Sequence, residues 1–350
     1  MKKPSGFSAI PGIFSFLTLW IPYHKTGAFT SLSALFGCPY LWYTTGKRSQ
    51  FHNRIRRAAE NPASWPACRG KEYLMRLGGT VCCEHPAEWE NRLVQSGFRA
   101  ITAPFTCDTP REETERLLRI IEKHDTVIAE VGVWRNPFDP AEGSANLDYA
   151  VRQLQLAEDL SVPCCVNIAG TESPFGWDAA DPGNFSDSMY RRLVASIREI
   201  IDRANPKKTF YCLEPMPWMI PDSPEVYLQL MRDVDREQFA VHMDFVNMIN
   251  CPRRFLDAEG FIEECFSRLG PYIKSTHLKD SRMDPMQLTT VLHECSPGEG
   301  SLDFVRVLRI IDRYLPADTP VLLEHMTTFE EYRRAYDYVA AKAAEAGVGV

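Results

Sequence analysis

Several motifs that would assign a protein to a class at once are missing from this sequence. The 350 residues contain no CxxC pair, no glycine-rich GxGxxG turn and no Walker phosphate loop. These absences argue against a zinc ribbon and against an open, doubly wound nucleotide-binding sheet. Eleven cysteines occur singly or as the adjacent pairs Cys82-Cys83 and Cys164-Cys165. We interpret them as reduced, mostly buried thiols rather than a disulfide framework.

An excess of positive charge is also missing. The chain has 39 lysines and arginines against 46 aspartates and glutamates, which gives a formal net charge of -7. A nucleic-acid binder would need a basic surface, so we expect no nucleic-acid partner. The 45% of hydrophobic and 24% of charged residues are ordinary for a folded globular protein with a sizeable core.

The N-terminal part has no long uninterrupted hydrophobic run. The apolar stretch 7–23 follows two lysines, but Pro11 and Pro22 interrupt it, and it falls short of the roughly 18 apolar residues that a membrane span needs. We therefore expect no membrane association and a cytoplasmic location. Residues 1–74 show no helical or strand period. We interpret them as an irregular extension, either disordered or the result of a misassigned start, before a catalytic domain at 75–350.

From Met75 onward, short β-rich runs alternate with amphipathic helical stretches. Apolar residues recur at helical spacing between the runs, as in Leu147–Leu154 and Phe304–Ile311. Thr109–Glu112 and Thr328–Glu331 have the form of capping boxes at helix starts. Eight strand-helix pairs predict an α/β fold, a closed (β/α)8 TIM barrel, rather than an open sheet. The expected strands are 76–81, 99–103, 126–133, 164–169, 209–214, 239–244, 273–278 and 321–324.

Four consecutive expected strands end in a residue type that binds metal ions. These residues are Glu214, Asp244, His277 and Glu324. The carboxyl ends of barrel strands meet at the face that carries active sites. Burying an ionised carboxylate is costly unless it is paired, and three carboxylates together repel one another. We therefore expect one divalent cation at this rim, with Mn²⁺ as the first choice and Mg²⁺, Co²⁺ or Zn²⁺ as alternatives.

Two further histidines lie close to these ligands in the sequence and are alternative imidazoles to His277. His242 points the same way as Asp244 but one layer deeper, so we expect it to support the ligands from below. His325 has the opposite strand parity to Glu324, so we expect it to pack behind the barrel wall.

Five motifs in the second half of the chain resemble those of one known family. They are Leu213–Trp218, His242–Asn247, Ser275–Asp280, Pro297–Phe304 and Leu323–His325. On these motifs, the chain from Met75 to the C-terminus resembles the xylose isomerase-like TIM barrels, often described as sugar phosphate isomerases or epimerases. That group includes ketose 3-epimerases, inosose dehydratase and, more distantly, endonuclease IV.

The resemblance implies a metal-dependent sugar isomerase or epimerase. It assigns the family's metal ligands to the same four residues, Glu214, Asp244, His277 and Glu324. In the ketose 3-epimerases the two ligand glutamates are also the bases, which implies catalytic roles for Glu214 and Glu324. Those epimerases have a histidine three residues after the aspartate ligand, whereas this chain has Asn247. Because of this departure, the resemblance to the ketose 3-epimerases does not identify the substrate of this chain.

The expected chemistry is proton transfer next to a carbonyl. A bound metal would act as a Lewis acid while a carboxylate removes the neighbouring proton to give an enediolate. Return of the proton to the other face gives an epimer, and its return to the next carbon gives an isomer. The alternative is elimination, by a lyase or dehydratase that acts on keto-sugars or 3-keto-glycosides. The resemblance implies a small-molecule carbohydrate substrate. It also implies either a homo-oligomer or a small partner subunit.

Residues on and after the third, fourth and fifth expected strands are candidates for the sugar pocket. They are Glu130, Trp134, Asn167 and Trp218, because aromatic faces stack on sugar C–H surfaces while polar groups hold hydroxyls. Core packing is the alternative for the tryptophans.

Lys279 shares the inward parity of His277. We expect Lys279 to bind an oxyanion or a phosphate group of the substrate. The alternative is a salt bridge to Asp244 or Asp280.

Two other classes compete with the isomerase. A phosphodiesterase like endonuclease IV would hold about three metal ions with more histidines, and the eight histidines and the acidic composition argue against it. The other class is a non-catalytic barrel that binds a sugar or a partner.

Overall fold

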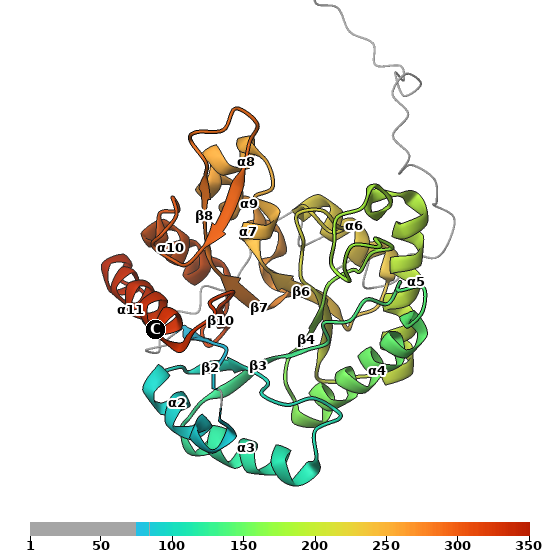
Figure 1. The fold of residues 1–350 in the computed structure, drawn as a ribbon, viewed down its shortest axis with the longest axis horizontal. Helices are drawn as coiled ribbons and strands as arrows, with labels where there is room; N and C mark the ends of the chain where they lie inside the picture. The colour runs from blue at the N-terminus through green and yellow to red at the C-terminus, as the bar shows by residue number, and fades with distance from the viewer. Residues whose placement is uncertain (1–74, 84) are drawn as a thin grey trace, which may run out of the picture. The chain divides into compact units, whose positions relative to one another are not determined.

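The computed structural model describes residues 75–83 and 85–350 (Figure 1). Our expectations for residues 1–74, an irregular extension or a misassigned start, lie outside the described residues. Within the described part of the chain, no helix is both long enough and apolar enough to cross a membrane.

Eight parallel strands close into a barrel, in the order β1-β10-β7-β6-β5-β4-β3-β2. The barrel closes where β10 pairs with β1, with Val321 beside Leu77 and Leu323 beside Gly79. All eight expected strands are present, so the predicted (β/α)8 barrel is confirmed. The barrel strands are β1 (Arg76–Gly79), β2 (Ala100–Thr102), β3 (Val127–Gly132), β4 (Cys164–Asn167), β5 (Phe210–Leu213), β6 (Phe239–Met243), β7 (Ile273–Leu278) and β10 (Pro320–Leu323).

Helices connect the strands and surround the barrel (Figure 1). Short helices lie in the connections. The longer helices are α2 (Trp89–Ser96), α3 (Arg111–Lys123), α4 (Gly143–Leu160), α5 (Asp187–Ala204), α6 (Pro224–Val234), α9 (Ala258–Leu269), α10 (Phe304–Tyr314) and α11 (Phe329–Ala346). The short ones are η2 (Pro86–Glu88), η3 (Pro182–Phe185), α7 (Phe245–Met248), α8 (Pro252–Leu256) and η4 (Gly270–Tyr272).

The helices pack through the apolar stripes seen in the sequence. In α10, Phe304, Val307 and Leu308 are buried at positions i, i+3 and i+4. At the start of α11 the predicted capping box is present, because the Thr328 and Glu331 side chains each accept a hydrogen bond from the other residue's backbone N–H. These local features hold the last helix against the strand that closes the barrel.

The prediction of a capping box at the start of α3 is wrong. The N-cap residue of α3 is Pro110, whose side chain makes no capping hydrogen bond. The Thr109 hydroxyl accepts a hydrogen bond from the Thr106 N–H instead, at 2.9 Å. The hydroxyl therefore stabilises the turn before the helix rather than its first turn.

An antiparallel hairpin that the sequence pattern did not predict follows β7. It consists of β8 (Asp280–Met283) and β9 (Leu292–Cys295), paired with Asp280 opposite Cys295 and Ser281 opposite Glu294. The Asp280 carboxylate accepts hydrogen bonds from the backbone N–H groups of Ser281, Gly298, Gly300 and Leu302. One buried carboxylate thus joins the base of the hairpin to the turn that leads into α10.

Small side chains form a separate cluster apart from the main core. Cys164, Val166, Cys212 and Ala240 pack together there and are fully or almost fully buried. All cysteines in the described part of the chain are free thiols. Burial raises the pKa of the Cys164 thiol well above its usual range, as expected for an unreactive thiol. Of the nine described cysteines, four are buried and five are only partly buried, so the expectation of mostly buried thiols holds for fewer than half of them.

Candidate functional site

Four side chains expected to bind a metal ion meet at the C-terminal rim of the barrel. Glu214 directly follows β5, Asp244 directly follows β6, His277 lies near the end of β7 and Glu324 directly follows β10. Each offers one ligand atom, and these atoms all lie within 4.8 Å of one another. We call this set the rim cluster. It gathers residues from four strands because parallel strands all end at the same face.

The imidazole of His277 points one nitrogen into the rim cluster. Its Nδ1 lies 3.0 Å from Glu324 Oε1 and 3.5 Å from Glu214 Oε1. Its other nitrogen, Nε2, lies 3.1 Å from Glu130 Oε1 on the opposite side of the ring. A ligand histidine in a metal site is commonly held in this way, by a carboxylate on the nitrogen that does not face the ion.

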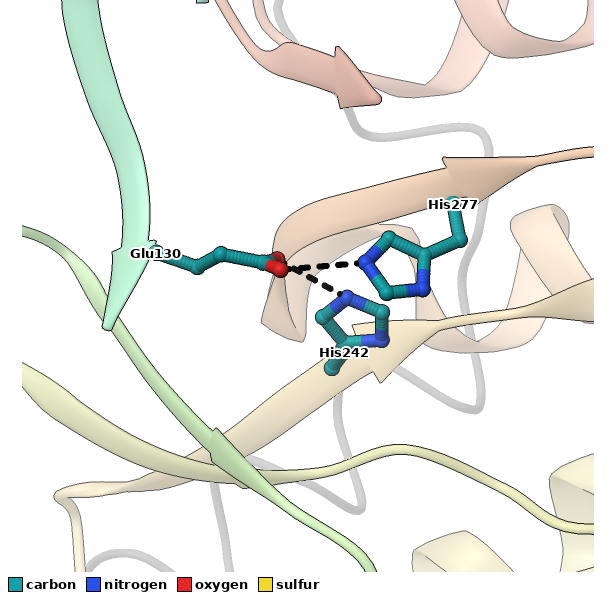
Figure 2. A group of neighbouring side chains, drawn as sticks. All are labelled: Glu130, His242 and His277. Carbon is teal, nitrogen blue, oxygen red and sulfur yellow. Dashed lines mark hydrogen bonds and ion pairs between the residues drawn. The ribbon is translucent and has the colours of Figure 1, made fainter. Parts of the chain in front are cut away.

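A second group of polar residues lies deeper in the barrel. Figure 2 shows Glu130 on β3 facing the rings of His242 and His277. Glu130 Oε2 lies 3.1 Å from His242 Nε2 and accepts a hydrogen bond from the Ser275 hydroxyl at 2.9 Å. The two imidazole rings are 4.0 Å apart in an edge-to-face arrangement. We call Glu130, His242, Ser275 and the Nε2 side of His277 the inner network.

The position of Glu130 differs from our expectation of a substrate contact. The residue is 1% exposed, and both carboxylate oxygens are occupied by the inner network. Burial alone would raise the pKa of Glu130, but His277 and His242 hold it well below its usual range. The carboxylate is therefore ionised and serves the two histidines. Strand parity correctly indicated that Glu130 points inward but could not give its depth.

His242 lies in the layer that strand alternation indicated. It is fully buried, one layer below Asp244, and its Nε2 faces Glu130. Glu130, His242 and His277 also lie close enough together to hold a metal ion. Both oxygens of the Glu130 carboxylate accept hydrogen bonds, so the single negative charge of this group needs no cation, although His242 Nδ1 is buried and makes no hydrogen bond.

The rim cluster is not satisfied in the same way. Asp244 Oδ2 and His277 Nδ1 are buried and make no hydrogen bond. Burial raises the pKa of the Asp244 carboxyl to about 8; Lys279 opposes this shift, and repulsion from Glu214 and Glu324 adds to it. A divalent cation would remove this conflict, and three carboxylates with one imidazole suit Mn²⁺, Mg²⁺, Co²⁺ or Zn²⁺. The residues present therefore fit a single divalent ion.

Lys279 is fully buried beside the rim cluster and contacts three carboxylates. Its Nζ lies 2.8 Å from Asp244 Oδ2, 2.9 Å from Glu324 Oε2 and 2.8 Å from Glu294 Oε2. The contact with Asp244 is an ion pair without the geometry of a hydrogen bond. Burial alone would lower the pKa of Lys279, but the surrounding carboxylates raise it well above its usual range.

The surroundings of Lys279 bear on the roles that we considered for it. An ammonium group shared by three carboxylates has little capacity left for a substrate oxyanion or phosphate. Of the two salt bridges that we considered, the one to Asp244 is present, whereas Asp280 instead caps the turn before α10.

Glu294 is a site residue that the sequence pattern did not indicate, and His325 does not lie where we expected it. Glu294 comes from β9, and its Oε1 lies 2.6 Å from His325 Nδ1. His325 was expected behind the barrel wall, but its side chain is 55% exposed and its Nε2 lies 3.4 Å from Glu324 Oε1. The expectation is wrong because His325 has a φ of 60°, which ends the strand alternation directly after Glu324. No period in the stretch before β9 marked Glu294.

Asn247 occupies the position at which the sequence departs from the ketose 3-epimerases. Its side-chain amide donates a hydrogen bond to Glu214 Oε1 at 3.0 Å, and its backbone N–H donates to Asp244 Oδ1 at 2.9 Å. Asp244 is also the residue that caps the short helix α7. Asn247 therefore orients two members of the rim cluster.

The two tryptophans expected in the sugar pocket are partly exposed. Trp134 and Trp218 are each 38% exposed, and Trp134 has an unusual backbone φ of 48°. Its indole lies directly over Gly132, where an added Cβ would come within 2.0 Å of the indole Nε1. The indole of Trp218 donates a hydrogen bond to the backbone oxygen of Asp178 at 2.8 Å. Both rings are accessible, and their contact with a sugar stays a prediction.

Asn167 is buried, and both ends of its amide are already used. Its Oδ1 accepts a hydrogen bond from the Arg135 N–H at 3.2 Å, and its Nδ2 donates to the Arg135 oxygen at 2.9 Å. The Nδ2 also lies 3.3 Å from the Tyr211 hydroxyl. The amide therefore fixes the loop after β3, which carries Trp134. This differs from the direct hydroxyl contact that we expected.

The closed parallel barrel and the carboxylate cluster at its C-terminal rim make this protein a (β/α)8 barrel with a candidate metal site. The family model described as "Xylose isomerase-like TIM barrel" matches residues 91–348. The chain belongs to this family. A search of curated protein sequences found no match.

Solved structures with the same fold are distant in sequence. They include a xylose isomerase-like TIM barrel protein from Mycobacterium smegmatis in complex with magnesium, with 15% identity, a TM-score of 0.58 and coverage of 78% of this chain and 97% of that one. A D-tagatose 3-epimerase-like protein has 15% identity, a TM-score of 0.59 and coverage of 78% and 98%. The probable 3-DHS dehydratase AsbF from Bacillus anthracis has 15% identity, a TM-score of 0.58 and coverage of 77% and 98%.

Proposed function

We propose that this protein is a metal-dependent isomerase or epimerase of a small carbohydrate. The observation that carries the proposal is the meeting of Glu214, Asp244, His277 and Glu324 within 4.8 Å at the C-terminal rim. Family membership supports it, as do structural neighbours that include an epimerase-like protein and a magnesium complex.

The four residues of the rim cluster would hold one divalent ion, and Mn²⁺ is our first choice for it. When bound, such an ion would act as a Lewis acid and make the proton next to a substrate carbonyl easier to remove. The inner network keeps His277 oriented, because Glu130 holds the ring nitrogen that faces away from the cluster.

Glu214 and Glu324 are the proposed bases. Their strands, β5 and β10, are separated in the barrel by β6 and β7, so the two carboxylates approach the centre from different sides. One carboxylate removes the proton from the carbon beside the carbonyl, which gives an enediolate. Delivery of a proton by the other carboxylate to the opposite face completes an epimerisation, and delivery to the neighbouring carbon completes an isomerisation.

A lyase or dehydratase of keto-sugars or 3-keto-glycosides is the second candidate. Two observations favour it: Asn247 stands where the ketose 3-epimerases have a histidine, and a neighbouring structure is named a probable dehydratase. The first step would be the same proton removal, followed by loss of a β substituent. A small partner subunit or a homo-oligomer belongs to the proposal in either case.

Deuterium exchange tests the proposed function directly. The Mn²⁺-loaded protein would be incubated in D2O with a panel of ketoses, inososes and 3-keto-glycosides, and products would be analysed by NMR and mass spectrometry. We expect solvent deuterium at a carbon beside the carbonyl of one substrate class. A product with the same molecular formula as the substrate, apart from deuterium, indicates the isomerase or epimerase, and loss of water or of an aglycone indicates the lyase. Absence of exchange with every compound would contradict the mechanism.

Metal content separates this proposal from a phosphodiesterase. We expect about one ion per chain, whereas a cluster of the endonuclease IV kind would hold about three.

A further inference from the structure

The ammonium group of Lys279 occupies oxygen atoms that a divalent ion would also need. It contacts Asp244 Oδ2 at 2.8 Å and Glu324 Oε2 at 2.9 Å, and both residues belong to the rim cluster. The Lys279 side chain is fully buried, so its charge is only weakly screened by solvent. A fixed positive charge at this position opposes the entry of a second cation.

A third carboxylate gives the ammonium an alternative partner. Glu294 Oε2 lies 2.8 Å from Lys279 Nζ, and Glu294 is outside the set of four candidate ligands. Its other oxygen, Oε1, is held by His325 Nδ1 at 2.6 Å. The Glu294 carboxylate is therefore fixed with one oxygen directed at the ammonium.

The hairpin couples Glu294 to Lys279 through the backbone. Lys279 lies between β7 and β8, and Glu294 on β9 is paired with Ser281 on β8. The Asp280 carboxylate anchors the hairpin base through backbone hydrogen bonds to Gly298 and Gly300. The distance between the two charged groups is thus set by a short, well-anchored piece of structure.

We propose that Lys279 is a resident cation that competes with the divalent ion for Asp244 and Glu324, and that Glu294 weakens this competition by holding the ammonium aside. The inference rests on the proposed metal site and adds a pair of residues that sets its affinity. With the ion bound, the ammonium stays with Glu294; without it, the ammonium offsets part of the negative charge of the rim cluster through Asp244 and Glu324.

Opposite effects of two substitutions on metal affinity test the proposal. Mn²⁺ would be titrated calorimetrically into the metal-free full-length protein. Lys279→Met removes the competitor, so we expect a Kd at least about tenfold lower than that of the wild type, which is 1.4 kcal/mol. Glu294→Gln leaves the ammonium with the ligand carboxylates alone, so we expect a Kd at least about fivefold higher. An unchanged or higher Kd for Lys279→Met would overturn the proposal.

Two controls separate this mechanism from a general effect of charge. Asp284→Asn removes a carboxylate from the same hairpin without touching Lys279, and we expect its Kd to stay within about twofold of the wild type. In the Lys279→Met background, Glu294→Gln should likewise change the Kd by no more than about twofold. Equal effects of Glu294→Gln in both backgrounds would contradict an action through the ammonium.

The result remains decisive if Lys279→Met does not fold without metal, because Glu294→Gln against Asp284→Asn tests the same competition with the lysine in place. The titrations also distinguish the inference from the proposed function. If the wild type binds no Mn²⁺ but Lys279→Met does, the competition is supported and the metal-dependent function fails. If neither protein binds Mn²⁺, both fail. If both bind it equally, only the inference fails.

Discussion

The inner network and the rim cluster contain the same kinds of residue but are stabilised differently. In the inner network one carboxylate, Glu130, is shared by two imidazoles and the Ser275 hydroxyl. In the rim cluster three carboxylates face one imidazole, and Asp244 Oδ2 and His277 Nδ1 have no hydrogen bond. In the inner network the single carboxylate is satisfied, and one ring nitrogen, His242 Nδ1, makes no hydrogen bond. The rim cluster holds an excess of buried negative charge, which a cation would offset.

His277 connects the two layers. Its Nε2 belongs to the inner network and its Nδ1 to the rim cluster. The inner network thus determines where the one imidazole of the rim cluster points. If this division is right, substitutions in the rim cluster should abolish function, and substitutions in the inner network should weaken it.

Glu324→Gln is expected to have the largest effect. Loss of a base that is also a candidate ligand should slow deuterium exchange into the substrate by about 10³-fold. Glu330→Gln, in the exposed first turn of α11, is the matched control and should leave the exchange rate unchanged. Exchange at the wild-type rate in Glu324→Gln would remove this residue from the mechanism.

Asp244→Asn should separate metal binding from stability. We expect Mn²⁺ binding to weaken by about 10³-fold, or about 4 kcal/mol. The melting temperature of the metal-free protein should not fall, because burial and repulsion from Glu214 and Glu324 outweigh the attraction of Lys279 for the ionised Asp244. Calorimetric titration and thermal unfolding measure the two effects. A large loss of stability without metal would mean that the rim cluster is satisfied without an ion.

Glu130→Gln should give a smaller loss of metal affinity together with a loss of stability. The amide cannot accept from two imidazoles and a hydroxyl at once, so His277 loses its fixed orientation. We expect Mn²⁺ binding to weaken about 10- to 100-fold and the free energy of unfolding to fall by about 1–3 kcal/mol. Affinity equal to that of the wild type would show that the inner network does not position the ligand.

The barrel was predictable from the sequence because its signals are local. Apolar runs bounded by helical stripes gave all eight strands, and strand ends gave the members of the rim cluster. Both signals lie in short stretches of sequence, so they can be recognised without knowing which distant residues are in contact. The Thr328 capping box was visible for the same reason.

The finer arrangement of the site was not predictable because it depends on backbone turns and on contacts between distant segments. The φ of 60° at His325 broke the alternation on which its expected position relied. Glu294 enters the site on a hairpin that has no marked period. Glu130 and Asn167 point inward as parity indicated, but their partners come from other strands and loops.

Thr328→Ala should have the smallest effect and lies outside both polar layers. Loss of the capping box should lower the free energy of unfolding by about 1 kcal/mol, measured by chemical denaturation. Mn²⁺ affinity should not change. A change in affinity would mean that α11 and the strand before it, which ends next to Glu324, are less rigid than the fold implies.

The central claim is that the rim cluster, rather than the inner network, holds a cation. Equilibrium dialysis of metal-free protein against Mn²⁺, with metal counted by mass spectrometry, tests it in the wild type, Asp244→Asn and His242→Gln. The account predicts about one ion per chain in the wild type, none in Asp244→Asn at the same free Mn²⁺, and one, bound more weakly, in His242→Gln. Two results would contradict the account: Asp244→Asn still binds the ion while His242→Gln does not, or the wild type binds no ion.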